Sequence, residues 1–176
     1  MQKLMMNRKG LRQIRFMKDK IVDRTCLKAE NSCLKKAGKR IVSTSGCFDI
    51  LHAGHVEYLE EAKKRGDILV VMLNSDASVQ RLKGKHRPIV TQADRAVVAA
   101  GLEAVDYVCI FHESTPCALI EEIQPDIVVK GGDYQGKHIP EMDTVAVYGG
   151  KVEYVLLVEG HSTTDIVRRC KEDMEK

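Results

Sequence analysis

Two histidines stand three residues apart in the segment His52-Ala53-Gly54-His55, where a glycine-containing turn meets an amphipathic stretch. At this spacing both imidazoles can lie on one side of a helix start, and Gly54 lets an anion approach the backbone closely. The helix N-terminus adds unpaired N–H groups and positive potential. Together these features predict a site that holds a triphosphate and stabilises charge on a transferring phosphoryl group. The alternatives are two unrelated surface histidines, or a metal site that would need a third ligand at a convincing spacing.

A second polar cluster stands near the end of the chain, where Ser162, Thr163 and Thr164 follow Gly160 and His161. Small hydroxyl residues at a helix start are typical N-caps, and this plain role is the alternative for the cluster. If the helix points at the same place as the two histidines, its hydroxyls and N–H groups can also hold the outer phosphates of a nucleotide. The cluster then forms the second half of a phosphate clamp.

A basic loop contains Lys83, Lys85 and Arg87. Charge runs are usually solvated, and that is the alternative here. The loop emerges near the carboxyl end of the second predicted strand, where a triphosphate or a sugar phosphate would need counter-charge. The loop could supply that charge.

A glycine pair follows the fourth predicted strand in the segment Lys130-Gly131-Gly132-Asp133. Two residues without side chains leave a bare backbone edge that can hydrogen-bond to a flat base. Asp133 could then fix the ribose or the acceptor. A plain turn is the alternative.

Apolar runs alternate with amphipathic segments from residue 40 onward. Continuous apolar runs such as 68–73 are typical of strands that are buried on both faces of a parallel sheet. The pattern predicts strands at 41–44, 68–73, 107–111, 127–130 and 152–158, and helices at 55–65, 77–82, 92–101, 116–123 and 163–171. A polar excursion to about residue 144 separates the last two strands. The expected fold class is α/β: a Rossmann-like, doubly wound, mainly parallel five-stranded sheet with helices on both faces, and with ligands at the carboxyl ends of the strands.

The bulk composition bounds the possible functions. The chain has 176 residues with a formal net charge of +3, which suits one domain of this class. Aromatic residues make up 5% and tryptophan is absent, so a stacking platform for nucleic acid is not expected. No apolar run is long enough for a membrane span, and none of the six cysteines forms a CxxC pair. We expect a cytoplasmic protein with free thiols and no membrane association, made of an N-terminal extension at residues 1–39, partly helical or disordered, and one domain at residues 40–176.

The segment GCFDILHAGH and the distant HSTTDIV together resemble the HxGH nucleotidyltransferases, the cytidylyltransferase-like family. NSD at residues 74–76 and KGGDY at residues 130–134 are similar to motifs of that family as well. Within the family, the combined motifs are most similar to the adenylyltransferase domains of ADP-heptose synthases, over nearly all of residues 40–171. The resemblance identifies residues 40–176 as a nucleotidyltransferase domain.

The resemblance also implies a reaction. AMP would move from ATP to D-glycero-β-D-manno-heptose 1-phosphate, giving ADP-heptose and pyrophosphate, when the sugar phosphate oxygen attacks the α-phosphate in line. Mg²⁺ would arrive with ATP, so no metal site made of protein ligands alone is expected. The implied partners are ATP, a sugar 1-phosphate, a separate sugar kinase that supplies it, and a second copy of the chain in a homodimer.

Site roles are carried over motif by motif. The resemblance implies that Asp49 braces the first loop or approaches the acceptor, while Arg95 is structural and ties its helix to the pocket wall or to a dimer partner. Four residues are implied to be catalytic: His52, His55, Lys83 and Lys85. The residues implied to bind the nucleotide are Gly46, Cys47, Phe48, Asp49, Gly54, Asn74, Gly131, Gly132, Asp133, Ser162, Thr163 and Thr164.

Two other functions stay open on the sequence alone. One is cytidylyl transfer to glycerol 3-phosphate or a similar polyol phosphate, because backbone contacts near Gly131 to Asp133 would choose the base and side chains do not reveal them. The other is a nucleotide-binding regulator that keeps the fold without turnover. The intact His52, His55 and STT sequence argue against that regulator.

Overall fold

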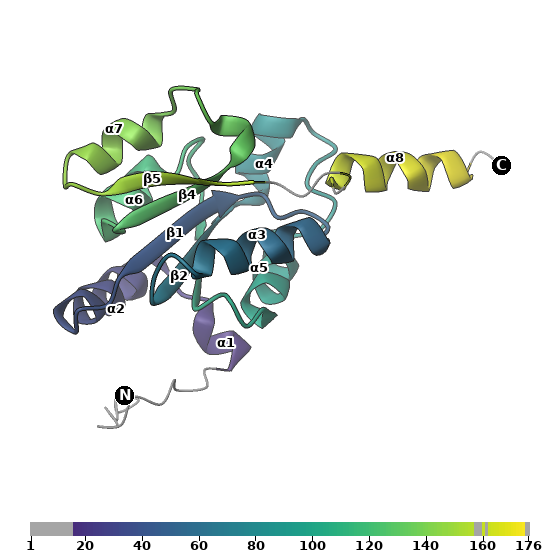
Figure 1. The fold of residues 1–176 in the computed structure, drawn as a ribbon. Coiled ribbons are helices and arrows are strands. Elements are labelled where there is room, and N and C mark those ends of the chain that lie inside the picture. The colour runs from purple at the N-terminus through teal and green to yellow at the C-terminus, as the bar shows by residue number, and fades with distance from the viewer. Residues whose placement is uncertain (1–15, 157–159, 161, 175–176) are drawn as a thin grey trace.

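The computed structural model describes residues 16–156, 160 and 162–174. Within this part of the chain, five strands form one parallel sheet in the order β3-β2-β1-β4-β5 (Figure 1). Because β1 pairs with both β2 and β4, the strand order reverses beside β1, where ligands bind in sheets of this kind. The strands are β1 (Ile41–Gly46), β2 (Ile68–Asn74), β3 (Tyr107–Phe111), β4 (Ile127–Gly131) and β5 (Lys151–Val155).

Helices connect the strands and cover both faces of the sheet (Figure 1). None of the helices in the described ranges is both long enough and apolar enough to span a bilayer. The helices are α1 (Met17–Lys20), α2 (Arg24–Lys36), α3 (Ala53–Lys63), α4 (Asp76–Lys83), α5 (Gln92–Gly101), α6 (Cys117–Ile123), α7 (Pro140–Ala146) and α8 (Thr163–Met174), with a 3₁₀ turn η1 (Gly132–Tyr134).

The core consists of two apolar layers, one on each face of the sheet. Consecutive strand residues point to opposite faces, so Val71 packs in the layer with Leu59 of α3, whereas Val70 packs in the layer with Leu119 of α6. Helices α3 and α5 contribute to the first layer, and α2, α6 and α7 contribute to the second. These layers confirm the predicted Rossmann-like α/β class.

The main difference from the sequence prediction is α7. The polar excursion expected up to about residue 144 in fact contains this seven-residue helix, which Pro140 opens and which buries Val145. A helix of two turns buries too few side chains to show a clear period, so polarity dominated the pattern. The fifth strand is also shorter than predicted, because it ends at Val155, and residues 157 and 158 lie outside the described part.

The segment before β1 packs against the sheet. Leu27 of α2 is 1% exposed and lies in the second core layer, and Arg24 forms ion pairs with Glu113 and Glu122. Ile21 makes a parallel bridge to Val108 of the edge strand. Two helices of the extension are therefore ordered on the domain, while the position at which the domain begins stays a prediction.

Candidate active site

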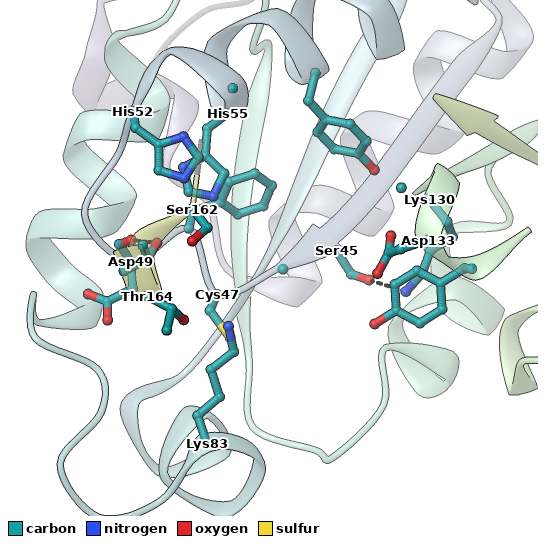
Figure 2. Close-up of a pocket in the computed structure, with 17 residues that line it drawn as sticks. Ser45, Cys47, Asp49, His52, His55, Lys83, Lys130, Asp133, Ser162 and Thr164 are labelled. Atoms are coloured by element: carbon teal, nitrogen blue, oxygen red, sulfur yellow. Dashed lines mark hydrogen bonds between the residues drawn. The ribbon is translucent and has the colours of Figure 1, made fainter. Parts of the chain in front are cut away.

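A pocket of about 430 Å³ opens at the carboxyl ends of β1 and β4, where the strand order reverses (Figure 2). Its wall comes from five segments that are far apart in the sequence: the β1–α3 loop, the start of α3, the end of α4, the β4–η1 turn and the start of α8. The lining residues are Ser45, Gly46, Cys47, Phe48, Asp49, His52, Gly54, His55, Tyr58, Lys83, Lys130, Gly131, Asp133, Tyr134, Ser162, Thr163 and Thr164. The structure thus brings both predicted halves of the phosphate clamp to one cavity.

The β1–α3 loop has an unusual backbone. Phe48 and Ile50 have φ angles of 46° and 52°, in the left-handed region that side chains rarely adopt. A Cβ on Gly46 would lie 3.0 Å from the Phe48 ring, so any larger residue at this position would push the ring away from the loop. The ring lies 5.3 Å from that of His55, centroid to centroid. The strained loop therefore places the Phe48 ring against the His55 ring. Backbone strain of this kind is common at functional sites.

The two histidines meet at the N-terminus of α3. Their rings are stacked with centroids 3.8 Å apart and an interplanar angle of 25°. The backbone N–H of His55 donates to the backbone carbonyl of His52 at 2.9 Å. Burial, and then the charges of His52 and Lys83, lower the pKa of His55 from 6.5 to about 4. His55 is consequently neutral at pH 7 and can bind a phosphate by donating an N–H rather than by charge. Within the described part of the chain its buried Nδ1 has no hydrogen-bond partner, which a ligand could provide.

The first turn of α8 faces the same cavity. Ser162 caps the helix, because its Oγ accepts from the N–H of Asp165 at 3.0 Å. Thr163 Oγ1 donates to the backbone carbonyl of Asp49 at 2.6 Å, which fixes the helix start against the β1–α3 loop. Thr164 also lines the cavity. The two predicted roles of this cluster, helix cap and phosphate clamp, are therefore compatible. The Ser162 hydroxyl caps α8, while the N-terminus of α8 still points into the pocket.

Asp49 braces the loops around the pocket. This carboxylate is 2% exposed and accepts from Arg87 Nε at 2.7 Å and from the N–H groups of Ile89 and Val90 at 2.9 Å each. Burial alone would raise the pKa of Asp49, but the two backbone N–H groups and the Arg87 guanidinium lower it below its ordinary value. The expected bracing role fits these contacts, which hold the segment from Arg87 to Val90 against the pocket wall.

Arg95 lies under the pocket rather than in it. Its side chain is 2% exposed and donates to the carbonyls of Val90, Cys47 and Asn74, and to the Asp76 carboxylate at 2.8 Å. It thereby ties α5 to the pocket wall, as predicted from the sequence.

Of the two lysines predicted to be catalytic, only Lys83 lines the pocket. Lys83 lines the pocket beside Cys47 (Figure 2). Lys85 is exposed and is not part of the lining. Burial raises the pKa of the Cys47 thiol despite the nearby charges of Lys83, Arg95 and Arg87, so this cysteine is a neutral part of the wall.

Two predicted nucleotide ligands do not line the cavity. Asn74 is 5% exposed, and its amide donates to Ser78 Oγ at 3.0 Å, so it organises the start of α4. Gly132 lies behind the wall, where a Cβ would meet the carbonyl of Val155 at 3.4 Å. Gly131 and Asp133 on either side of it do line the cavity.

Four lining residues were not predicted: Ser45, Tyr58, Lys130 and Tyr134. Tyr58 follows His55 at helical spacing, a signal that could have placed it on the same face. Its hydroxyl bonds to Thr44 Oγ1 at 2.7 Å and to the Val129 carbonyl at 3.0 Å, which joins α3 to β1 and β4. Lys130 is a charged residue at the end of an apolar strand, and this position could likewise have indicated that it lies at the pocket.

Comparisons with known proteins agree with this geometry. The cytidylyltransferase-like family model matches residues 43–169. The chain is 53% identical over 137 residues to the bifunctional protein HldE of Geotalea uraniireducens, covering 78% of this chain and 28% of that protein. It is 58% identical over 138 residues to the bifunctional protein HldE of Nitratiruptor sp., covering 78% of this chain and 29% of that protein. The chain therefore spans less than a third of the length of these curated relatives.

Solved structures show the same fold. The lipopolysaccharide core biosynthesis protein of Thermoplasma volcanium superposes with a TM-score of 0.56 and 34% identity, over 70% of this chain and 99% of that one. The pantoate-β-alanine ligase of Francisella tularensis superposes with a TM-score of 0.57 and 16% identity, over 86% of this chain and 76% of that one, which shows likeness of fold alone. Because the family model spans most of the sequence and curated and solved relatives share a third to more than half of the aligned residues, this chain belongs to the cytidylyltransferase-like family and is a nucleotidyltransferase.

Proposed function

We propose that this chain transfers AMP from ATP to D-glycero-β-D-manno-heptose 1-phosphate, releasing pyrophosphate and ADP-heptose. The observation that carries the proposal is the meeting of two helix starts in one cavity, with His52 and His55 at the start of α3 and Ser162 to Thr164 at the start of α8. The choice of a heptose 1-phosphate is supported by the motif resemblance to ADP-heptose synthases and by about 50% identity to HldE proteins over most of the chain.

The proposed reaction breaks one phosphoanhydride bond. An oxygen of the sugar 1-phosphate attacks the α-phosphorus, a new P–O bond forms, and the bond from the α-phosphorus to the bridging oxygen of pyrophosphate breaks. Charge builds on the transferred phosphoryl group and on the leaving pyrophosphate. The N–H groups of His52 and His55, the Lys83 ammonium and the N-termini of α3 and α8 are the donors that would stabilise this charge.

The described residues offer no ready protein cage for magnesium. In residues 16–156, 160 and 162–174, no three His, Cys, Asp or Glu side chains gather where they could hold a metal ion. A magnesium ion that arrives with ATP would keep phosphate and water oxygens among its ligands, as this ion commonly does. When bound, it would neutralise part of the triphosphate charge.

Three wider expectations belong to the same proposal. A separate sugar kinase would supply the 1-phosphate, two copies of the chain would form a homodimer, and the reaction would take place in the cytoplasm. Sedimentation analysis of the purified chain tests the dimer.

A substrate panel tests the reaction itself. Pyrophosphate release is measured with each of four nucleoside triphosphates against heptose, hexose and polyol phosphates. The proposal predicts the highest kcat/KM with ATP and the heptose 1-phosphate. Turnover only with CTP and glycerol 3-phosphate would contradict it and favour the cytidylyl alternative. Nucleotide binding without any turnover would favour a regulator.

A further inference from the structure

A buried ion pair lies at the end of the pocket opposite the histidines. Lys130 Nζ lies 2.8 Å from Glu141 Oε1, and the two side chains are 10% and 6% exposed. Lys130 is in β4, and Glu141 is in the first turn of α7, so the pair joins this helix to the pocket wall. An unpaired charge at such a site would be costly, and Glu141 therefore holds the Lys130 ammonium in one place.

Lys130 reaches from this pair toward the cavity. Its Nζ is 3.5 Å from Ser45 Oγ and 4.7 Å from the centroid of the Tyr134 ring, and all three residues line the pocket (Figure 2). An ammonium has three N–H donors. Glu141 accepts one at a short distance, while the contact to Ser45 is at the limit of a hydrogen bond, so donor capacity is left for a ligand.

The two ends of the pocket differ in charge. At the Lys130 end, Glu141 cancels the ammonium charge and the Asp133 carboxylate adds a negative one. At the histidine end, the Asp49 carboxylate is paired with Arg87, and Lys83 and the N-termini of α3 and α8 supply positive potential. A phosphate chain is therefore attracted to the histidine end and repelled from the Lys130 end. The uncharged part of a bound substrate is left to occupy the Lys130 end.

We propose that Lys130 is a specificity-determining residue that donates a hydrogen bond to an oxygen or nitrogen acceptor on the uncharged part of a substrate, the nucleoside or the sugar. Glu141 is a positioning residue that acts through Lys130. The inference rests on the proposed nucleotidyl transfer and deepens it, because it gives the Lys130 end of the same pocket a role in binding the uncharged part of a substrate. The proposal predicts that Lys130 does not bind a phosphate group, and the experiment below would detect it if it did.

The test removes the pair without leaving a buried charge. In the variant Lys130→Met/Glu141→Leu both charges go together, and buried ion pairs can often be replaced by apolar residues without loss of stability. Should that variant not fold, Lys130→Arg keeps the charge but moves the donors. The matched control is Lys63→Met, which breaks a partly buried pair with Asp106 at 2.5 Å outside the pocket. Thermal unfolding is recorded for every variant.

Three quantities separate the possible ligands: the affinity for ATP, the affinity for inorganic pyrophosphate, and the KM for the sugar phosphate. We expect the double variant to lose about tenfold in ATP affinity if the nucleoside is the ligand, or in sugar phosphate KM if the sugar is, as for one lost hydrogen bond to a charged group. Its pyrophosphate affinity should equal that of Lys63→Met. Loss of pyrophosphate affinity equal to the loss of ATP affinity would overturn the inference, as would three values equal to those of the control. A wild-type chain without turnover on any substrate pair would instead overturn the proposed function, and this inference with it.

Discussion

The hydroxyl of Thr163 donates a hydrogen bond of 2.6 Å to the backbone carbonyl of Asp49, across 114 residues of sequence. This contact joins the start of α8 to the strained loop that follows β1. It is the direct link between the two halves of the proposed clamp, because Asp49 lies three residues before His52 and Thr163 directly follows Ser162.

Removal of this link should weaken catalysis more than folding. Thr163→Val keeps the shape of the side chain and loses the donor, so we expect a loss of about 1 kcal/mol in the free energy of unfolding. We expect kcat/KM to fall by about tenfold to a hundredfold, since small errors in positioning are costly in transfer reactions. Thr115→Val, at an exposed threonine outside the pocket, is the control. Equal kcat/KM in the two variants would show that the contact does not position α8.

The depressed pKa of His55 makes stability depend on pH. The folded-state pKa of about 4 lies below the ordinary 6.5, so the unfolded chain binds more protons between these values. This contribution to stability is fully present above pH 6.5 and is lost as the pH falls toward 4. The wild type should therefore lose more thermal stability than His55→Gln when the pH is lowered from 7 to 5, measured as the shift in Tm.

Asp49 does not interfere in that pH window. Its folded pKa is lowered from 3.8, so its own contribution is lost only as the pH falls below the unfolded value. Parallel losses of Tm in the wild type and in His55→Gln between pH 7 and 5 would contradict a neutral, buried His55.

The basic loop contributes one lysine to the pocket. Lys83 lines the cavity beside Cys47, and Lys85 is exposed outside it. We expect Lys83→Ala to lower kcat/KM by about tenfold more than Lys85→Ala, because a charge-assisted contact to phosphate is lost only in the first variant. Steady-state pyrophosphate release measures both. A larger loss in Lys85→Ala would mean that the loop moves over the substrate and that Lys85 is the contact.

The Asp49 carboxylate should keep the basic loop in place. In Asp49→Asn the amide cannot accept from Arg87 and two backbone N–H groups with the same charge assistance. We expect faster amide hydrogen exchange at Ile89 and Val90, together with a loss of about 2 kcal/mol or more in the free energy of unfolding. Asp94→Asn, which removes a carboxylate bound to Thr91 on the surface, is the control. Unchanged exchange at Ile89 and Val90 would exclude the bracing role.

The sequence was sufficient for the sheet and for the two turns that meet at the pocket. Runs such as Ile68–Asn74 are apolar at every position but the last and are bounded by polar turns, so they are recognisable without tertiary information. The meeting of these turns could be predicted because His52 and Ser162 both stand at helix starts that follow strands, and parallel topology brings such turns to one edge of the sheet.

Other features depend on contacts that no local pattern reports. Asn74 was predicted to bind the nucleotide, but its amide turns inward to Ser78. The pair of Lys130 with Glu141 could not be foreseen, because Glu141 lies on α7, a helix that the polar sequence did not predict. The left-handed backbone at Phe48 is set by the packing of its ring over Gly46 and is not reported by its residue type.

The most direct test of the central claim is pyrophosphate release from ATP and D-glycero-β-D-manno-heptose 1-phosphate by the wild type and by His55→Ala. We predict release that requires both substrates and that falls by roughly 10²–10³ in the variant, as when a preorganised donor to a developing charge is removed. Release by His55→Ala at the wild-type rate, with both proteins folded, would contradict the claim that this pocket is where the phosphoryl group is transferred.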